Sequence, residues 1–326
     1  MQPFKIMRWK GPATARWGRW LAWCGVLAFS GLAPALALGP EGVQTDGSSV
    51  TFKSGEQPLM VYRYVENPAK PYISMLYSPG GVNVLRDSPA DHKHHHGLMF
   101  AVAVDGVDFW SENAKCGRQV NRSKDAAKLV AQQGATFAFG PQQIDWLAPG
   151  SDKLVLRETR AVSVWSRQSN ATLNSTYVTW QTRLEPPPGK DSVTLTGSTY
   201  FGLGMRFVPS MDKGGHFVNA DGKTGMAGTN NVRSAWCAYS ASADGKPVTV
   251  AMFDSPANPR HPATWFTLDS GFAYLSATLD LSRQPLAIAA GKPLELNYRV
   301  AVWDGKVDPA TIAAFYRAIA RADGAK

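Results

Sequence analysis

The chain has 326 residues, of which 44% are hydrophobic and 18% are charged. This composition excludes a wholly disordered protein, because disordered chains carry too few apolar residues to bury a core. The formal net charge is +9, but the first 37 residues hold five basic residues and no acidic one, which leaves 29 basic against 25 acidic residues. Because that remainder has a net charge of only +4, we expect no nucleic-acid partner.

The N-terminal segment has the pattern of a secretion signal. Residues 1–20 are basic and aromatic, residues 21–36 are apolar or small, and Ala35-Leu36-Ala37 fits the small-x-small cleavage pattern. The apolar run is shorter than the roughly 20 residues that a membrane span needs. We therefore expect residues 1–37 to be removed, an uncleaved anchor being the alternative. Residues 38–326 should then form a periplasmic or secreted protein without stable membrane insertion.

Removal of this signal leaves two cysteines, Cys116 and Cys237. In an oxidising compartment they could form one disulfide, and two separate buried thiols are the alternative. Two cysteines are in either case too few for a metal site made of cysteine alone.

Alternation of apolar and polar residues dominates residues 38–326 and predicts β-strands. The predicted strands are rich in Val, Thr and aromatic residues, with clusters of Gly, Pro, Asn and Asp between them. They cover residues 60–65, 98–104, 153–159, 176–182, 192–197, 247–253, 264–268, 272–277 and 294–303. About a dozen strands at this spacing predict an all-β fold, a large antiparallel β-sandwich forming one domain.

A single helix is predicted, at residues 309–322. Asp308 can cap it and Pro309 occupies its first position, while an apolar face is formed by Ile312, Phe315, Tyr316 and Ile319. We expect this helix to pack on the sandwich. Two long stretches, residues 79–97 and 209–231, lack periodicity, and long loops of this kind are often functional.

Four of the six histidines fall within five residues: His92, His94, His95 and His96. Near pH 7 an imidazole can donate, accept or transfer a proton, or bind a metal. If this segment is extended, His92, His94 and His96 share one face and could ligate a divalent metal, with Asp87 or Asp91 orienting a ring from behind. The alternatives are a histidine-rich surface loop and metal-free substrate binding or acid/base catalysis.

Other candidate site residues lie in short motifs downstream. Asp108, Trp110 and Glu112 follow an Asp-Gly turn and suit a sugar, whose apolar face stacks on aromatic rings and whose hydroxyls need acceptors. An ordinary hairpin with Trp110 in the core is the alternative. Arg206 stands in apolar company, either in a structural ion pair or as a substrate clamp.

The segment Asn258-Pro259-Arg260-His261-Pro262 precedes Trp265. Its two prolines would stiffen a loop that presents Arg260 and His261. A plain turn is the alternative.

The joint pattern resembles the PmoA-like family. The motifs that carry the resemblance span residues 62–303 and are Tyr77-Ser78-Pro79-Gly80-Gly81, Arg86-Asp87-Ser88-Pro89, Asp91-His92-x-His94-His95-x-Gly97, Gly106-Val107-Asp108-Phe109-Trp110, Gly202-Leu203-Gly204-Met205-Arg206-Phe207, Trp236-Cys237-x-Tyr239 and Asn258-Pro259-Arg260-His261-Pro262-x-x-Trp265. Lys93 and Phe266 depart from the pattern, where proline and histidine are expected.

This resemblance implies a β-sandwich associated with carbohydrate metabolism, of which the galactose-mutarotase-like supersandwich is one form. The methane-oxygenase label that accompanies the family does not suit this chain, because a true methane monooxygenase subunit of that name is an integral membrane protein. Phe266 puts the role of its family position in doubt here.

Two functions compete. The first is an enzyme acting on a sugar or oxidised sugar, as an epimerase, a lyase or a glycoside-cleaving enzyme, with His94, His95 and His261 in acid/base roles on opposite sides of the substrate. Its substrate-binding residues would be Arg86, Asp108, Trp110, Glu112, Arg206, Asn258, Arg260 and Trp265.

The second function is a non-catalytic sandwich that binds a glycan or a protein partner. Histidines converging with carboxylates would favour the enzyme, and tryptophans on a flat exposed face would favour the binding protein. A metal-dependent oxygenase has only the histidines in its favour.

Overall fold

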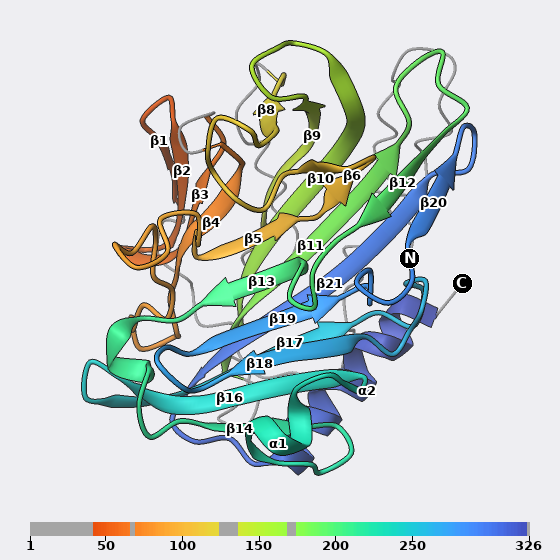
Figure 1. The fold of residues 1–326 in the computed structure, drawn as a ribbon. Helices are drawn as coiled ribbons and strands as arrows, with labels where there is room; N and C mark the ends of the chain where they lie inside the picture. Colours follow the sequence, from red (N-terminus) through yellow and green to blue (C-terminus); the bar gives the residue numbers. More distant parts are fainter. Residues whose placement is uncertain (1–41, 66–68, 124–135, 168–173, 325–326) are drawn as a thin grey trace, which may run out of the picture.

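The computed structural model describes residues 42–65, 69–123, 136–167 and 174–324. The predicted secretion signal lies outside these residues. Within them the chain folds into three antiparallel sheets (Figure 1). The predicted all-β sandwich is therefore confirmed.

The first sheet has nine strands. In spatial order they are β1 (Gly42–Thr45), β2 (Ser49–Ser54), β3 (Gln57–Arg63), β4 (Tyr72–Leu76), β5 (Leu98–Ala101), β13 (Gly202–Arg206), β19 (Tyr274–Thr278), β18 (Thr264–Leu268) and β15 (Val232–Arg233).

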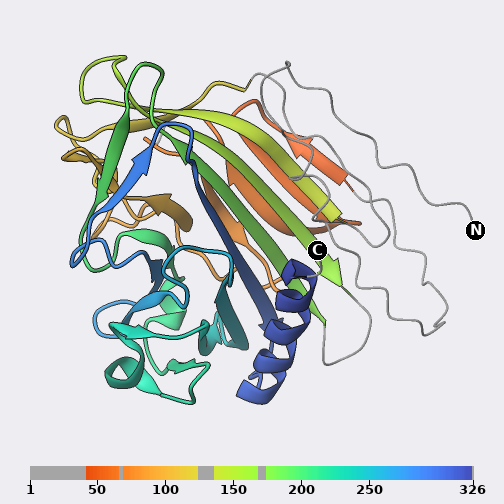
Figure 2. The same ribbon diagram turned by 90° about the vertical axis from the view of Figure 1, so that its right-hand side faces the viewer.

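The second sheet has eight strands, among them the longest of the fold, which run side by side in Figure 2. In spatial order they are β14 (His216–Asn219), β16 (Trp236–Ala243), β17 (Lys246–Asp254), β21 (Leu294–Asp304), β11 (Ser175–Glu185), β10 (Leu154–Arg167), β9 (Thr136–Leu147) and β8 (Arg118–Asn121).

A smaller sheet of four strands completes the fold. It is built from β20 (Leu286–Ala289), β12 (Ser192–Thr196), β6 (Ala103–Val104) and β7 (Val107–Asp108). Inward side chains of all three sheets join one hydrophobic core, for example Leu203 of β13, Val300 of β21 and Leu195 of β12. The alternating apolar residues that predicted the strands supply this core.

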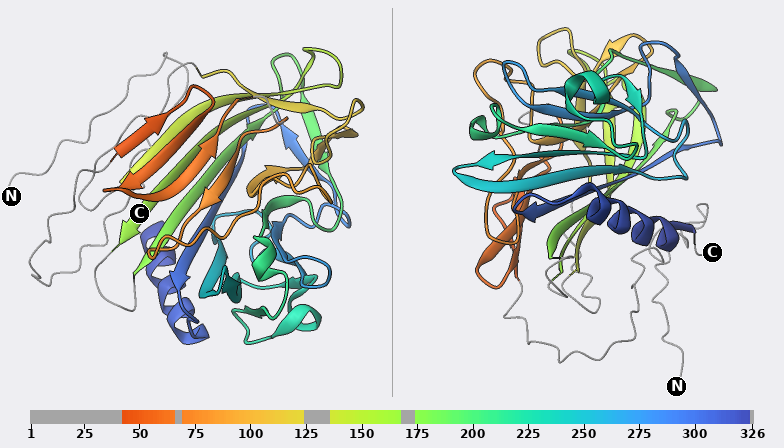
Figure 3. Two further views of the ribbon diagram at one scale, coloured as in Figure 1. Left: turned by 90° about the vertical axis from the view of Figure 1, so that its left-hand side faces the viewer. Right: turned by 90° about the horizontal axis from the view of Figure 1, so that it is seen from below.

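The predicted C-terminal helix is confirmed as α2 (Pro309–Gly324). Asp308 accepts hydrogen bonds from the Thr311 backbone N–H at 2.9 Å and from its hydroxyl at 2.7 Å, as a capping residue does. Ile312, Phe315 and Ile319 pack in a second apolar cluster with side chains of β16, β17 and β21. Figures 2 and 3 show α2 lying against the eight-stranded sheet.

The stretch 209–231, which lacks periodicity, contains short elements that the pattern does not predict. They are the 3-10 helix η2 (Pro209–Met211), strand β14 and helix α1 (Gly225–Thr229). The stretch 79–97 is instead an irregular connection between β4 and β5. Its hydrogen bonds are local or go to neighbouring strand ends, which explains why it shows no strand or helix period.

A buried ion pair on β10 faces the core and bonds to the segment before β4 of the other large sheet. Arg160 and Glu158 of β10 are both fully buried and joined at 2.7 Å. Arg160 Nη1 also donates to the carbonyl of Pro71 at 2.7 Å, and Nη2 donates to Gln119 Oε1 at 3.0 Å. Because Pro71 lies between Lys70 and Tyr72, this network fixes the segment that enters β4.

Cys116 and Cys237 are both free. Cys237 lies in the hydrophobic core, whereas Cys116 is half-buried in the loop after β7 and its thiol contacts Asp108 Oδ2. Of the two alternatives from the sequence, the structure has separate thiols.

Candidate functional site

Three of the four clustered histidines, His92, His94 and His95, lie in a tight loop, residues 88–95, which is closed by a bridge between Asp87 and the fourth, His96. Turns form inside it, because the His92 N–H donates to the Pro89 carbonyl at 3.0 Å and the His95 N–H to the His92 carbonyl at 2.9 Å. We call it the histidine loop. Gly97 follows it with φ +41°, and a Cβ there would lie 2.1 Å from the Ile73 carbonyl, so only glycine suits the exit.

The histidine loop meets the ends of four neighbouring strands of the nine-stranded sheet. Ile73, near the start of β4, pairs with Leu98, the first residue of β5, and Leu98 also pairs with Met205 near the end of β13. The next pair, Arg206 with Tyr274, brings in the start of β19. Segments far apart in the sequence therefore converge at one edge.

A chain of hydrogen-bonded charged groups runs beneath the loop. Glu112 Oε1 accepts from Lys70 Nζ at 2.5 Å and contacts His96 Nε2 at 2.9 Å. His96 Nδ1 contacts Asp87 Oδ1 at 2.7 Å, and Asp87 Oδ2 accepts from the Tyr72 hydroxyl at 2.8 Å. Both ring nitrogens of His96 thus face carboxylates, an arrangement that suits the doubly protonated ring.

Burial and neighbouring charges shift the pKa values of the groups in this charged chain in different directions. Burial lowers the pKa of His96, but the hydrogen bonds to Asp87 and Glu112 outweigh it and raise the pKa. Burial likewise raises the pKa of Glu112, but the hydrogen bond from His96 and the charge of Lys70 outweigh it and lower the pKa to about 2. Burial lowers the pKa of Lys70. His96 therefore favours its cation and Glu112 its carboxylate.

His94 and His95, at the end of the histidine loop, have lowered pKa values instead. Burial, followed by the charges of Lys70 and His92, lowers the pKa of the half-buried His94. Burial and the neighbouring His94 and His92 lower the pKa of His95 to about 2. Both imidazoles are therefore mainly neutral at pH 7. Within the described residues neither ring nitrogen of His94 has a hydrogen-bond partner, and the rings of His92 and His95 lie beside it.

Arg206 forms a structural ion pair, one of the two alternatives for this residue. Its Nη2 donates to Asp91 Oδ2 at 2.8 Å, and its Cζ lies 3.7 Å from the centroid of the Phe272 ring. Asp91 also holds His92 Nδ1 at 3.0 Å. The imidazole of His92 stacks on that of His95, with centroids 4.6 Å apart. These contacts fix the shape of the histidine loop rather than present Arg206 to a ligand.

The extended conformation considered for the histidine segment is not the one the structure has. The turns inside the loop stack His92 on His95, while His96 turns inward and is held between Asp87 and Glu112. His92, His94 and His96 are therefore not on one face. Over the described ranges, no group of three or more His, Cys, Asp or Glu side chains is arranged to hold a metal ion. The expected metal ligand set does not fit a divalent cation, so no step is routed through a metal.

Asp108 and Trp110 are less exposed than a sugar-contacting pair would be. Asp108 Oδ1 accepts from the N–H groups of Trp110 at 2.6 Å and Ser111 at 3.2 Å, which closes the local turn. Trp110 is only 1% exposed, and Phe201 stacks on its ring with centroids 5.0 Å apart. Trp110 is therefore a buried wall and not an open stacking surface.

A flat tryptophan face is not present in the part of the chain that the structure describes. Trp165 is half-buried, and the other six tryptophans outside the predicted signal are at most 2% exposed, namely Trp110, Trp146, Trp180, Trp236, Trp265 and Trp303. The feature that would have favoured a glycan-binding sandwich is thus absent from the described residues.

The loop after β17 forms a separate cluster. His261 Nδ1 contacts Asp254 Oδ2 at 2.7 Å, and Asp254 Oδ1 accepts from Asn258 Nδ2 at 2.7 Å. The guanidinium of Arg260 donates to three backbone carbonyls, of Leu279, Gln284 and Pro285. Arg260 and Asn258 therefore brace loops.

The structure places His261 and the histidine loop toward opposite ends of β19, and the expected pairing of the two across one substrate stays a prediction. His261 precedes Thr264, which pairs with Thr278 at the end of β19, whereas the histidine loop contacts the start of β19. The intervening pairs from Thr264 to Leu268 span roughly 13 Å along the strands. Of the remaining two candidates, Trp265 is buried with its indole N–H on the Ser234 carbonyl. Arg86 directly precedes Asp87 at the base of the histidine loop, and its guanidinium lies 4.0 Å from the Asp212 carboxylate.

Sequence patterns missed several residues of this site. Lys70, Tyr72 and Tyr274 join it only through folding, since they lie on different strands or segments. A lysine that is 1% exposed is unusual, but the sequence around Lys70 has no pattern that predicts its burial. Glu112, which was a candidate, proves to be the centre of the charged chain.

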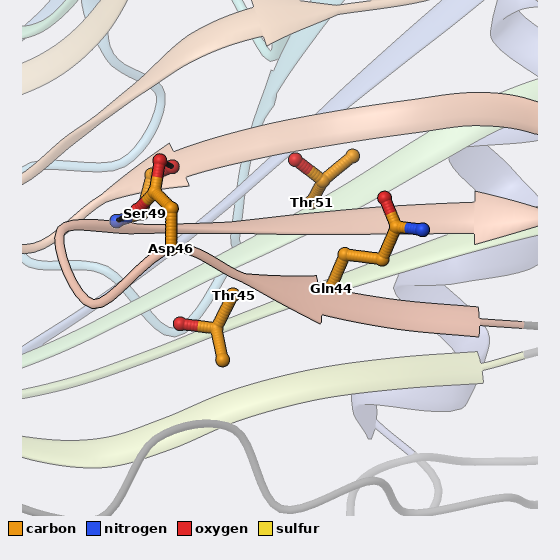
Figure 4. A pocket seen from close by; sticks show the side chains of 5 residues that line it. All are labelled: Gln44, Thr45, Asp46, Ser49 and Thr51. Carbon is orange, nitrogen blue, oxygen red and sulfur yellow. Dashed lines mark hydrogen bonds between the residues drawn. The ribbon is translucent and has the colours of Figure 1, made fainter.

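A second surface feature, on the β1–β2 hairpin, carries no such chemistry. An open depression is lined by Gln44, Thr45, Asp46, Ser49 and Thr51 (Figure 4). The carboxylate of Asp46 already accepts hydrogen bonds from Ser48 and Ser49, which lower its pKa and close the hairpin turn. The histidine loop and the charged chain thus form the candidate functional site.

Comparison with known proteins places the chain in a family. A family model with the description "Family of unknown function (DUF6807)" matches residues 49–317, which include the whole candidate site. The chain belongs to this family. The region that matches DUF6807 includes every described strand of this chain from β2 to β21. A search of curated proteins found no match.

The solved structures that match this chain include several carbohydrate enzymes. An α-galactosidase from Lactobacillus brevis matches with a TM-score of 0.45 and 6% identity over 85% of this chain and 42% of its own. The GH36 α-galactosidase AgaA from Geobacillus stearothermophilus gives 0.43 and 9%, over 82% and 41%. A heparinase III gives 0.38 and 10%, over 84% and 37%. This DUF6807 chain spans about two fifths of the length of these enzymes.

No described helix of this DUF6807 protein combines the length and the apolarity needed to cross a bilayer.

Proposed function

We propose that this DUF6807 protein is an exported carbohydrate-active enzyme that abstracts a proton from an oxidised sugar, with His94 as the general base. The observation that carries the proposal is the position of His94. Its imidazole is mainly neutral, has no hydrogen-bond partner among the described residues, and lies within electrostatic reach of Lys70, Glu112 and His96. A neutral imidazole with an available nitrogen is the form that accepts a proton near pH 7.

Glu112 would bind a sugar hydroxyl beside this base. Lys70 and His96 both contact Oε1, whereas Oε2 takes part in no hydrogen bond within the described residues, and the side chain is 18% exposed. A carboxylate oxygen fixed in this way is a good acceptor for a hydroxyl. Lys70, His96 and Asp87 would act through Glu112 as positioning residues.

The protonation of Glu112 favours proton abstraction over glycoside cleavage. Cleavage by paired carboxylates needs one of them as a general acid with a raised pKa, but the pKa of Glu112 is lowered to about 2. Removal of a proton next to a carbonyl needs a base instead. His94 would take the proton, and the C–H electron pair would form the enolate of a keto-sugar or uronate. Return of a proton to the opposite face would give the epimer, whereas departure of the β-oxygen substituent, which takes a proton from water, would give the elimination product.

The cellular setting is part of the same proposal. The N-terminal pattern supports export to the periplasm or the medium. The motif resemblance to PmoA-like proteins supports a carbohydrate substrate, and four of its histidine-loop residues, Asp91, His92, His94 and His95, make direct contacts in the candidate site.

The test is proton exchange in D₂O, followed by the loss of the ¹H signal next to the carbonyl. The probes are D-galacturonate and a methyl 3-keto-glucopyranoside. We expect exchange with the wild-type protein and a loss of about 10²- to 10⁴-fold in His94→Ala. His216→Ala, which changes an exposed histidine on β14, is the matched control and should retain full activity. Exchange that is unchanged in His94→Ala, or absent with both probes in the wild type, would overturn the proposal.

A further inference from the structure

Next to the histidine loop, aromatic rings cover the outer side of β13, β18 and β19. Tyr200 and Phe266 are half-buried, and their ring centroids lie 5.7 Å apart at an interplanar angle of 62°. They form a corner of two accessible rings, which we call the aromatic corner. The corner adjoins Trp110, whose centroid is 5.3 Å from that of Tyr200, and Tyr274, 6.3 Å from that of Phe266.

The aromatic corner is continuous with the candidate site. Tyr274 lies 5.0 Å from His95 between ring centroids, and Trp110 lies 6.1 Å from His95. Trp110 is also two residues before Glu112 and supplies its carbonyl to Lys70 Nζ at 3.0 Å. The rings of Trp110 and Tyr274 therefore connect the aromatic corner to His95 of the candidate site.

Two donors next to this corner have no acceptor. The Trp110 indole N–H and the Tyr274 hydroxyl are buried, with the residues 1% and 2% exposed, and neither has a hydrogen-bond partner among the described residues. Buried donors in folded proteins are nearly always satisfied, and each unsatisfied one destabilises the fold. The Tyr274 hydroxyl packs against Gly204. A Cβ at this position would lie 2.1 Å from the hydroxyl oxygen, so any larger residue would displace the tyrosine ring.

We infer that the aromatic corner is a pyranose-binding subsite. The apolar C–H face of the sugar packs on Tyr200 and Phe266, and one ring oxygen or hydroxyl accepts from Trp110 Nε1 and the Tyr274 hydroxyl. Pyranoses present both an apolar face and polar oxygens, which match stacked rings beside unpaired donors. This inference rests on the proposed carbohydrate function and extends it to a substrate class, a saccharide held beside the reacting carbon.

The experiment measures sugar affinity by ligand-observed NMR, using methyl α-D-glucopyranoside, methyl β-D-galactopyranoside, D-galacturonate and cellobiose as probes. We expect the wild-type protein to bind at least one probe. Tyr274→Phe should raise the Kd about 3- to 10-fold, the effect of losing one hydrogen bond, without lowering Tm, because it removes an unpaired buried group. Tyr200→Ala should raise the Kd about tenfold, through the lost ring face.

Tyr64→Phe is the matched control. Its hydroxyl pairs with Thr45 at the far edge of the sheet, so this change should leave the Kd unaltered. An unchanged Kd in Tyr274→Phe would mean that a buried water satisfies the hydroxyl, and together with an unchanged Kd in Tyr200→Ala it would overturn the subsite. No binding of any probe would overturn the saccharide class.

The outcome is separable from that of the proposed function. His94→Ala should still bind the probes while losing proton exchange. Binding without exchange in the wild type would contradict only the proposed reaction.

Discussion

Replacing Glu112 with glutamine is expected to lower the free energy of unfolding by about 3–5 kcal/mol, the range for breaking a buried ion pair by removing one partner. Lys70 Nζ lies 2.5 Å from Glu112 Oε1, and the two side chains are 1% and 18% exposed. His96 Nε2 contacts the same oxygen at 2.9 Å. Glutamine keeps the shape but removes the negative charge, so the ammonium and the imidazolium lose their shared counter-ion in a buried place.

Urea denaturation measures this loss, and two further variants give it meaning. Glu295→Gln changes a carboxylate that is 48% exposed and pairs with Arg183 at 3.3 Å, and it should cost less than about 1 kcal/mol. Adding Lys70→Met to Glu112→Gln removes the stranded charge and should recover part of the stability. If Glu112→Gln unfolds at the same urea concentration as the wild type, the charged chain does not contribute to folding.

The second large effect is expected in the core, where Arg160→Met should also cost about 3–5 kcal/mol. Arg160 and Glu158 are both 0% exposed, and the guanidinium lies 4.6 Å above the Trp180 ring. Methionine preserves volume but leaves the Glu158 carboxylate with only the Trp146 N–H and the Thr182 hydroxyl as donors. An uncompensated buried charge is the main reason for the loss.

The double variant Glu158→Gln/Arg160→Met should be more stable than Arg160→Met alone, because no buried charge remains. Arg122→Met, in an ion pair with Asp145 that is 47% and 26% exposed, is the matched control and should change stability by less than about 1 kcal/mol. Equal unfolding free energies for Arg160→Met and Arg122→Met would contradict the structural role of the buried pair.

Strands with one face on the core were predictable from sequence. Strand β18 has the predicted bounds, because Trp265 and Thr267 point into the core while Phe266 and Leu268 are half-buried. Strand β13 shows no alternation and was not predicted, since all five of its residues are buried. Strand β9 contains Gly140-Pro141, which is typical of a turn, and a register irregularity opposite Arg160 and Val162 accommodates the dipeptide within the strand.

The site was predictable only in part, for a physical reason. The cluster of histidines is visible in the sequence, and Glu112 was a candidate. The direction of each ring, however, depends on the turns at Pro89 and His92, which no hydrophobic period encodes. Tyr274 reaches the site through the pairing of β19 with β13, and Lys70 through the segment that precedes β4. Contacts between segments so far apart cannot be predicted from local sequence.

The central claim is that the histidine loop holds a neutral His94 beside a cationic His96. The measurement that tests it most directly is a pH titration of the ring ¹⁵N signals in labelled protein, with the single variants His94→Gln and His96→Gln to assign them. A lowered pKa keeps His94 neutral at pH values where a free imidazole, with a pKa near 6.5, is already charged. A raised pKa keeps His96 protonated as the pH rises past 6.5.

The account therefore predicts that His94 becomes protonated below pH 6.5 and that His96 loses its proton above it, while His95 stays neutral down to far lower pH, in keeping with its pKa of about 2. The reverse order for His94 and His96, or titration of both near the value of a free imidazole, would contradict the assignment of His94 as the base.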